Sequence, residues 1–506
     1  MSESLPLRYL GEYILDAGLS AILIMSKKEY PEELTYADWI NCLEKIKDYY
    51  IQNVLKESIN IAFTLNGYNN PSCKNGSREM KIEEIFSIAI HGKNKRLASK
   101  NPEPVPPDGE LCAFYENEVA DIYVARDRYP LLPERDNLNL TPNGEGYLAV
   151  SKWVLGCVLA SIFVAPKIDN GLLYISTYDR EMLLEIHKIL YEKYILRQIS
   201  IHKSGGDVNS FKVRHVPSRI YEIVNEVVAE KEENRLLYPI ACYYISNDGR
   251  SPFAYIYRFP SNLVIFIKRV NTAKYKHEWQ DFINSFYVYS SKTKNNDLTE
   301  QKQYETVNTA YDYMLKSKHY DTMKFVDGFI KGFFLKYILN KTKNYTNVEE
   351  IKSNINYRSI WDLLKLFIKT LFRGKYNSDM EEQIKVIERF APKLADAVEK
   401  DVHKKLYKKI LGYGGVDIDN YKQFTNFLIK LSKDYAEVTG EYLFSMDDFI
   451  VLFTKSTKKY KMGWLTVRNL LIMKLIEELV KRGYFKHHKE EENSDSGYDV
   501  YDANDL

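Results

Sequence analysis

The chain has 506 residues and a mass of 59.3 kDa, which is enough for two or three domains with substantial cores. Hydrophobic residues make up 45% and charged residues 28%, a composition that is typical of globular proteins and excludes a largely disordered chain. The 71 Lys and Arg nearly balance the 69 Asp and Glu, which excludes a uniformly basic or acidic protein but not a local basic face.

A capping box at Thr35 and Asp38 marks an early helix. The Thr35 hydroxyl can accept a backbone N–H, and Asp38 favours the positive end of the helix. Apolar residues at three- and four-residue spacing extend this helix towards Glu57. Turn residues then follow from Asn66 to Gly76, and four prolines between Asn101 and Gly109 predict a linker or an extended surface loop.

Apolar residues in the middle of the chain predict one helix and three strands. The continuous run from Trp153 to Ala165, which ends before a proline, predicts a buried helix. The strand-forming segments are Ile240–Ile245, Phe253–Phe259 and Leu263–Val270, and turn residues separate them. The short turns predict a three-stranded antiparallel meander.

The chain becomes polar between Ser290 and Gln303, and we place a domain boundary there. Beyond it, helical patterns follow one another with hardly any proline. They cover residues 304–340, 357–373, 379–411, 420–437, 446–455 and 464–482.

Cap signals mark the ends of several of these helices. Ser378 with Glu381 and Ser445 with Asp448 form capping boxes that predict helix starts, and Gly483 predicts a helix end. The sequence as a whole predicts an α+β fold. Residues 1–295 form a mixed α/β domain with the antiparallel meander, residues 296–489 an all-helical bundle, and residues 490–506 an acidic disordered tail.

Neither the cysteines nor the apolar runs indicate an exported or membrane protein. Five cysteines are too few for a disulfide framework in a chain of this length. The first residues lack the pattern of a signal peptide, and the run from Trp153 to Pro166 is too short to span a bilayer. We therefore expect a cytoplasmic protein that does not associate with a membrane.

Charge is distributed unevenly along the chain. Residues 301–485 hold about ten more Lys and Arg than Asp and Glu, whereas residues 486–506 hold about five more acids than bases. Two lysine groups stand out in the helical region, and the candidate polyanion-binding residues there are Lys404, Lys405, Lys408, Lys409, Lys455, Lys458, Lys459, Lys461 and Arg468. Such groups either bind phosphates or form an ordinary solvated face, and the regional surplus favours nucleic acid.

A second set of candidates lies in the first region. A loop that combines Asn, Lys and Arg with Gly and Pro offers groups that can hydrogen-bond to base edges. These candidates are Asn69, Asn70, Lys74, Asn75, Arg78, Lys93, Lys95, Arg96, Arg126 and Arg128. The alternative is a solvent-exposed turn with scattered charges.

Common catalytic signatures are missing from the sequence. It contains no phosphate-binding GxxxxGK[ST] loop, no HExxH and no GxSxG motif. Asp447 and Asp448 could form a carboxylate pair for metal catalysis, but they open a predicted helix, where acids match the helix dipole. His487 and His488 could bind a metal, but a solvated helix end explains them as well. We expect no catalytic residues, no metal and no cofactor.

Several short motifs in the first third of the chain resemble, in order, those of one family. They are Asp16-Ala17-Gly18-Leu19-Ser20-Ala21, Pro31–Thr35 with Asp38, Asn70-Pro71-Ser72, Cys112-Ala113-Phe114-Tyr115, Tyr123–Asp127, Tyr129–Leu132, Asn139 and Pro142–Glu145. The family is the CXXC-CXXC group of large subunits of type I CRISPR effector (Cascade) complexes, mostly of subtype I-B.

The chain departs from this family at its cysteines. Cys112 is followed by Tyr115 where the family carries a CxxC, and Cys73 has no cysteine three residues away. Tetrahedral zinc needs four ligands within reach. We therefore expect no zinc site, and packing and loop hydrogen bonds should take over its structural role.

The resemblance implies an antiviral interference role without catalysis. Large subunits of these complexes recognise the protospacer-adjacent motif, help to open the target DNA and stabilise the R-loop. The implied partners are the guide crRNA, target double-stranded DNA, the backbone, handle-capping and small subunits, and the helicase-nuclease. The C-terminal part of relatives can also be made separately as a small subunit, for which Met323 and Met380 are candidate starts.

Two alternatives to this role stay open. A nuclease with an unrecognised site would require metal-dependent cleavage that Asp447→Ala and Asp448→Ala abolish. A helical scaffold without a nucleic-acid role would leave the chain inert to DNA and RNA even among its partner subunits.

Overall fold

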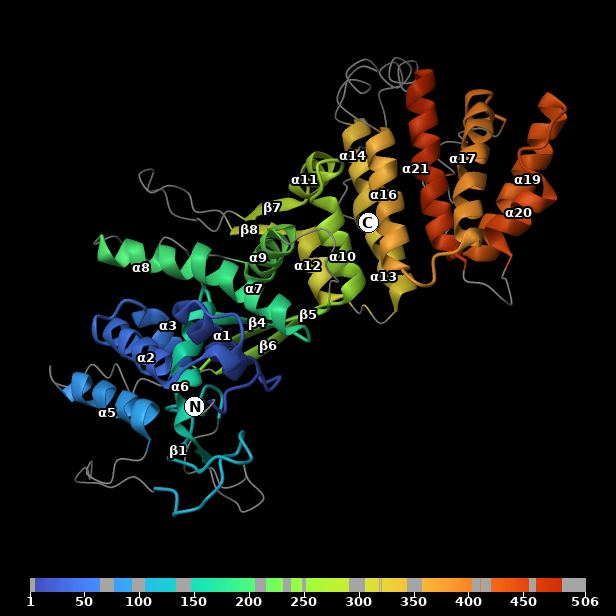
Figure 1. Cartoon of the computed structure of the whole chain (residues 1–506). Coiled ribbons are helices and arrows are strands. Elements are labelled where there is room, and N and C mark those ends of the chain that lie inside the picture. Colours follow the sequence, from blue (N-terminus) through green and yellow to red (C-terminus); the bar gives the residue numbers. More distant parts are fainter. Residues whose placement is uncertain are drawn as a thin grey trace. The chain divides into compact units, whose positions relative to one another are not determined.

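The computed structural model describes residues 5–63, 77–92, 105–132, 147–204, 215–230, 238–247, 252–290, 305–317, 319, 321–343, 357–402, 410, 420–454 and 461–484. The fold is α+β: small antiparallel sheets lie in the N-terminal part, and the C-terminal part is helical (Figure 1). In the described residues, no helix has both the length and the apolar character needed to cross a bilayer.

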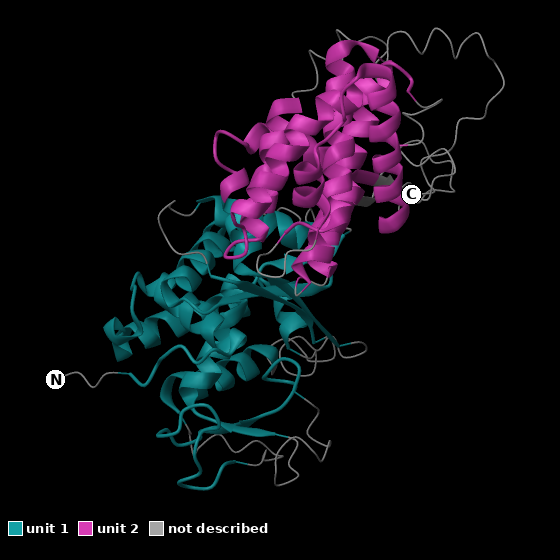
Figure 2. Cartoon of the chain, turned by 90° about the vertical axis from the view of Figure 1, so that its right-hand side faces the viewer, with its two compact units in different colours: residues 1–268, 289–307 teal, residues 269–288, 308–506 magenta. Residues whose placement is uncertain are grey.

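The chain divides into two compact units, which Figure 2 shows in different colours. Unit 1 comprises residues 1–268 and 289–307, and unit 2 comprises residues 269–288 and 308–506. The division thus differs from a single boundary at residue 295. The reason is Phe282 of α11 (Lys276–Asn284), which packs against Phe329 and Phe334 in the helical unit.

Unit 1 contains most of the shorter elements. Its helices are α1 (Tyr13–Ser26), η1 (Pro31–Glu33), α2 (Tyr36–Ile51), α3 (Lys56–Ala62), α5 (Ser77–His91), α6 (Lys152–Ala160), η2 (Ser161–Val164), α7 (Arg180–Leu190), η3 (Tyr191–Ile195), α8 (Leu196–Lys203), α9 (Val216–Glu230) and most of α10 (Ser261–Val270). The capping box at Thr35 and Asp38 is confirmed, but its helix ends at Ile51 and a separate helix follows.

A four-stranded antiparallel sheet, with the order β3-β4-β5-β6, is the largest sheet of unit 1. Its strands are β3 (Lys167–Ile168), β4 (Gly171–Thr177), β5 (Ile240–Ser246) and β6 (Phe253–Phe259), and Ile175 of β4 pairs with Cys242 of β5. Two-stranded sheets join β1 (Ile122–Val124) to β2 (Leu148–Val150) and β7 (Tyr287–Ser290) to β8 (Glu305–Asn308).

The predicted meander is right for two strands and wrong for the third. Leu263–Val270 belongs to helix α10, and β4 takes the place of the third strand. Leu263, Phe266 and Val270 are all buried at helical spacing. A short continuous apolar run is compatible with either a strand or a buried helix, so its periodicity could not decide between them.

The core of unit 1 forms around a close crossing of α1 and α6. A Cβ atom at Gly18 would lie 1.8 Å from the carbonyl oxygen of Cys157, so only glycine permits this approach. The predicted buried helix from Trp153 to Ala165 is confirmed as α6 followed by η2. Its side chains fill the core together with those of α1.

Unit 2 is helical. Besides α11, it contains α12 (Thr309–Lys316), α13 (Thr322–Phe329), η5 (Ile330–Leu335), α14 (Lys336–Lys343), α16 (Tyr357–Leu371), α17 (Ser378–Glu399), α19 (Tyr421–Thr439), α20 (Met446–Phe453) and α21 (Trp464–Arg482). The predicted helix over residues 304–340 is interrupted between α12 and α13, and the predicted helix from residue 379 ends at Glu399.

The cap signals of unit 2 are partly confirmed. Ser445 and Asp448 form the expected capping box, and Gly483 ends α21 in a left-handed conformation with φ of 79°. The capping box at Ser378 is wrong, because Asn377 is the cap and accepts hydrogen bonds from the backbone of residues 379 and 380. An Asn one residue earlier satisfies the same orphan donors.

The longest helices of unit 2 run in the same direction. Gln383, near the start of α17, contacts Met462 just before α21, and Arg482 at the end of α21 contacts Glu399 at the end of α17. The first turns of these helices therefore lie at one end of the unit and their last turns at the other. The predicted tail, residues 490–506, lies outside the described residues.

Candidate nucleic-acid interface

Most of the candidate nucleic-acid-binding residues lie outside the described part of the chain. These are Asn69, Asn70, Lys74, Asn75, Lys93, Lys95, Arg96, Lys404, Lys405, Lys408, Lys409, Lys455, Lys458 and Lys459. The structure describes five others, and each has a definable position. They are Arg78, Arg126, Arg128, Lys461 and Arg468.

Arg78 binds the end of α2. Its two terminal nitrogens donate to the backbone oxygens of Tyr50 and Ile51, at 2.7 Å and 3.3 Å. These carbonyls belong to the last turn of the helix, where a cation is favoured. Partial burial lowers the pKa of Arg78 from its ordinary value. The guanidinium of Arg78 therefore stabilises the fold by joining α5 to the end of α2.

Arg126 belongs to a hydrogen-bond network centred on Asn247. Its Nε donates to Oδ1 of Asn247 at 3.1 Å, and Nδ2 of Asn247 donates to the backbone oxygens of Arg126 and Ala62 at 2.9 Å and 3.0 Å. Asn247 is fully buried at the end of β5. Arg128 contacts the backbone oxygen of Tyr123 at 3.5 Å, so both arginines are engaged within unit 1.

Lys461 closes the end of α20. Its ammonium donates to the backbone oxygens of Ile450 and Val451, both at 3.2 Å. Beside it, the buried Gln383 donates to Leu452 and accepts from the backbone N–H of Met462 at 2.8 Å. These contacts fix the residues on either side of the segment that carries Lys455, Lys458 and Lys459.

Arg468 is 5% exposed, among the buried polar residues of α21. The neighbouring Thr466 and Asn469 are also buried. The basic group that the sequence suggests around residues 455–468 therefore does not extend to Arg468 as an exposed ridge. The Arg468 side chain lies in the interior of unit 2.

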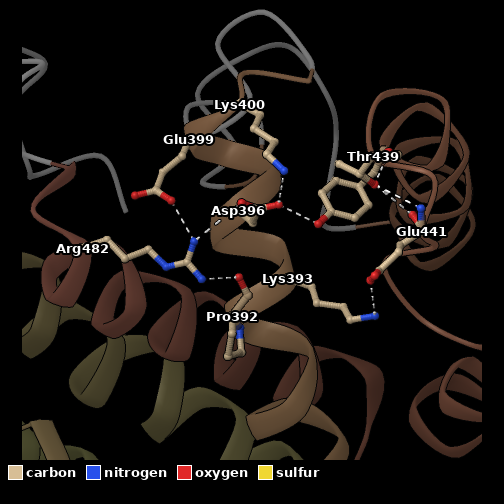
Figure 3. A network of polar contacts seen from close by, with 9 residues as sticks. Pro392, Lys393, Asp396, Glu399, Lys400, Thr439, Glu441 and Arg482 are labelled. Carbon is tan, nitrogen blue, oxygen red and sulfur yellow. Dashed lines mark hydrogen bonds and ion pairs between the residues drawn. The ribbon is translucent and has the colours of Figure 1, made fainter.

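A network of polar contacts occupies the far end of the parallel helices (Figure 3). Asp396 of α17 accepts a hydrogen bond from the Tyr435 hydroxyl at 2.6 Å and pairs with Lys400 at 2.9 Å. Arg482 of α21 pairs with Glu399 at 2.7 Å and donates to the backbone oxygen of Pro392. The described cations at this end are thus matched by acceptors of the chain itself.

The described motifs of the family resemblance converge in unit 1, whereas Asn70-Pro71-Ser72, Asn139 and Pro142–Glu145 lie outside the described residues. Asp16 accepts the backbone N–H groups of Leu10 and Gly11 at 2.7 Å and 2.9 Å. The ring of Phe114 stacks on that of Tyr129, with centroids 5.7 Å apart.

Two further contacts link these motifs to α1 and to the start of α6. Tyr129 hydrogen-bonds to Glu12 at the start of α1. The sulfur of Cys112 accepts the backbone N–H of Ser151 at 3.3 Å. Motifs separated by more than a hundred residues therefore form one buried cluster around the first turns of α1.

The cysteines that the structure describes in this unit are structural. Cys42, Cys112, Cys157 and Cys242 are buried and free of disulfides. Burial raises the pKa of Cys42 to about 12, so its thiol is protonated at neutral pH. Among the described residues, no three His, Cys, Asp or Glu side chains come together in a way that could hold a metal ion.

Asp448, one of the two candidate catalytic acids, takes part in helix capping. Ser445 Oγ accepts the Asp448 backbone N–H at 3.1 Å, and the Asp448 carboxylate pairs with Arg389 of α17. Burial raises the pKa of Asp448, but Arg389 and Ser445 lower it more, so that the net shift is downward. Asp448 therefore caps the start of α20 and joins this helix to α17.

Sequence reasoning missed a set of cations on α16. Arg358 and Lys369 lie on the side opposite to its buried residues, and the exposed Arg373 follows just after the helix ends. The signal was present as a helical repeat of basic residues, but a single acid, Asp362, interrupts it and no dense lysine run draws attention to it.

Comparisons of the chain with protein-family models, curated proteins and solved structures found no match.

Proposed function

We propose that the chain is the non-catalytic large subunit of a type I CRISPR RNA-guided surveillance complex in the cytoplasm. In this role it binds the guide crRNA and target DNA, reads the motif beside the target, stabilises the R-loop and helps to recruit the helicase-nuclease. The backbone, handle-capping and small subunits would be its stable partners. Guide pairing would supply sequence specificity, as is general in such systems.

The convergence of the family-like motifs carries this proposal. Cys112, Tyr115 and Tyr129 belong to the same hydrophobic core, and Asp16 of α1 is buried as well; each of the four is at most 5% exposed. The described motifs thus share one core, as parts of a single domain do. Their meeting supports the view that they are parts of one inherited domain core.

The plan of the chain supports the proposal further. A mixed unit with small sheets is followed by a helical unit, the arrangement that the resemblance implies. The regional surplus of about ten positive charges in residues 301–485 provides an attraction for polyanions.

Assembly with a guide RNA tests the proposal most directly. The chain, carrying an affinity tag, is co-expressed with a repeat–spacer array and the backbone and handle-capping subunits of its genomic neighbourhood. We expect the tagged chain to bring down these subunits with a short repeat-derived RNA. If the tagged chain purifies without RNA and without the backbone subunits even at low salt, the proposal is wrong.

DNA binding by the assembled complex tests the lysine groups. Reversal of Lys404, Lys405, Lys408 and Lys409 to Glu should weaken binding and flatten its salt dependence, because each phosphate contact releases counterions. The matched control reverses Lys316 and Lys324, which pair with Asp312 and Asp321 in the same unit. Equal affinities of the two variants across a salt series would remove the first four lysines from the interface.

Reading of the flanking motif needs a different measurement. Replacement of Asn69 and Asn70 by Ala should change the preference among flanking sequences in a library of targets, because amide groups read base edges. A uniform loss of affinity for all flanking sequences would assign this loop a positioning role only.

A further inference from the structure

One face of α16 carries cations that no described carboxylate neutralises. Arg358 and Lys369 are eleven residues apart, which puts them on one side of α16, and Arg373 follows in the turn just after the helix ends at Leu371. All three are exposed, whereas Leu364 and Phe367 on the opposite side are fully buried. None of the three cations has an ion-pair partner among the described residues. The helix therefore presents a positive stripe to solvent.

Two cations from a distant part of the chain extend this stripe. The Arg269 guanidinium reaches α16 and donates to Oγ1 of Thr370 at 3.4 Å. The pKa of the Lys274 ammonium is raised, mainly by Tyr275 and to a smaller extent by the nearby carboxylate of Asp362. Both are exposed. We call Arg269, Lys274, Arg358, Lys369 and Arg373 the α16 cationic surface.

The acids around this surface are already engaged. Asp362 pairs with Lys365 at 3.2 Å, and that lysine also lies 3.6 Å from Glu388. Glu278 of α11 hydrogen-bonds to Ser359 and has Lys341 nearby. Neighbouring carboxylates therefore leave most of the positive charge of the α16 cationic surface without neutralisation.

Two exposed lysines of unit 2, by contrast, are paired with acids. Lys316 pairs with Asp312 at 2.8 Å, and Lys324 pairs with Asp321 at 3.3 Å. The cations of the α16 cationic surface thus differ from lysines whose charge a neighbouring acid matches.

Tyrosine rings lie beside cations of this surface. The Lys274 ammonium is 4.9 Å from the centre of the Tyr275 ring, and the Lys369 ammonium is 5.9 Å from that of Tyr376. Both rings are partly exposed. Proteins that bind single-stranded nucleic acid combine cations along the phosphate backbone with aromatic rings on which bases stack.

We propose that the α16 cationic surface binds a single nucleic-acid strand. From Arg358 to Lys369 the helix rises about 16 Å, along which one strand presents about five phosphates. The charge of the surface selects a polyanion, and Tyr275 and Tyr376 favour a strand with accessible bases over an acidic protein. The proposal concerns the chain by itself, so it does not depend on assembly with a guide RNA.

Fluorescence anisotropy on the purified full chain tests the proposal. The probe is a fluorescein-labelled oligothymidine of about 20 nucleotides, which exceeds what the surface can cover, in a NaCl series from about 50 mM. For Lys369→Glu with Arg373→Glu, we expect about tenfold weaker binding and a salt slope smaller by about 1.4, since each lost contact to a single strand removes about 0.7. The control, Lys316→Glu with Lys324→Glu, should bind like the unmodified chain.

Three outcomes would overturn the proposal. They are a full chain that does not bind the probe at low salt, a double variant that binds like the control, and displacement of the probe by polyglutamate as effective as by unlabelled oligothymidine. A milder variant, Arg358→Gln with Lys369→Gln, guards against misfolding. Its affinity for the probe should lie between those of the Lys369→Glu, Arg373→Glu variant and the control. Replacement of Tyr275 and Tyr376 by Ala should weaken binding without a change in the salt slope, because stacking releases no counterions.

Discussion

The Tyr435 hydroxyl donates a 2.6 Å hydrogen bond to the Asp396 carboxylate and so joins α19 to α17. The same carboxylate holds Lys400 at 2.9 Å, and Arg482 of α21 approaches its other oxygen at 4.0 Å. One acid thus links the last turns of three helices that run in the same direction.

Removal of this hydroxyl should loosen the helical unit. Tyr435 is 5% exposed, so Tyr435→Phe keeps the packing and deletes a hydrogen bond to a charged group. We expect a loss of about 1–2 kcal/mol in the free energy of unfolding, measured by urea denaturation. Tyr421→Phe is the matched control, because its hydroxyl donates to a neutral backbone oxygen at 2.9 Å and should cost less. An equal cost of the two changes would contradict a special role of Asp396.

The contribution of Asp396 should depend on pH. Burial raises the pKa of its carboxyl, but hydrogen bonds from Tyr435 and Lys400 and the nearby Arg482 lower it more, so it lies below its ordinary value. A lowered pKa in the folded state adds stability above the unfolded pKa, near about 4, and this stability is lost as the pH falls through the folded value. The difference in Tm between the chain and Asp396→Asn should therefore be largest near neutral pH and shrink in acid. A constant difference across the range would contradict this account.

Glu12 should give the opposite pH dependence in unit 1. Burial raises the pKa of this helix cap to about 7, although hydrogen bonds from Leu15 and Tyr129 oppose the shift. A folded pKa above the unfolded one means that the stability is complete below the unfolded pKa and is lost as the pH rises through about 7. Glu12→Gln keeps an acceptor for the backbone of Ile14 and Leu15, so we expect it to raise the Tm at about pH 8 but not at about pH 4. Scanning fluorimetry at both pH values measures this, and equal shifts at the two would contradict the assignment.

Local signals predicted most helices of unit 2, for a physical reason. A capping box such as Ser445 with Asp448 and a left-handed glycine such as Gly483 act within one turn, so adjacent residues contain the information. The segment Leu263–Val270 was misread because five consecutive apolar and buried residues, Leu263 to Ile267, hide the helical period.

Tertiary contacts were beyond sequence reasoning. Arg269 and Thr370 are 101 positions apart, and nothing in either segment points to the other. Likewise Arg78 and Arg126 are basic residues next to turn segments, where solvent exposure is the usual outcome. Only the fold shows that Arg78 closes the end of α2 and that Arg126 belongs to the network of Asn247.

Two glycines offer a direct test of the packing in each unit. A methyl group at Gly18 would meet the Cys157 backbone, whereas a Cβ at Gly332 has no atom within 4 Å. We expect Gly18→Ala to cost at least about 3 kcal/mol or to prevent folding, since the clash is with backbone. Gly332→Ala should be neutral or stabilise by up to about 1 kcal/mol, because alanine is the better helix former. Similar soluble yields and denaturation midpoints for both variants would contradict the close approach of α1 and α6.

Gln383 should be the most sensitive polar residue of the bundle. It is fully buried, accepts the Met462 N–H at 2.8 Å and donates to the backbone oxygen of Leu452 at 3.2 Å, so it joins the end of α20 to the approach to α21. Gln383→Leu fills a similar volume but leaves these backbone groups unpaired in the interior, which costs about 1–3 kcal/mol for each. We expect a loss of about 2–4 kcal/mol in urea denaturation. Gln423→Leu, on the exposed face of α19, is the control and should change the stability little, because its side chain carries no buried contact. A Gln383 variant as stable as this control would mean that the backbone of residues 452 and 462 finds other partners.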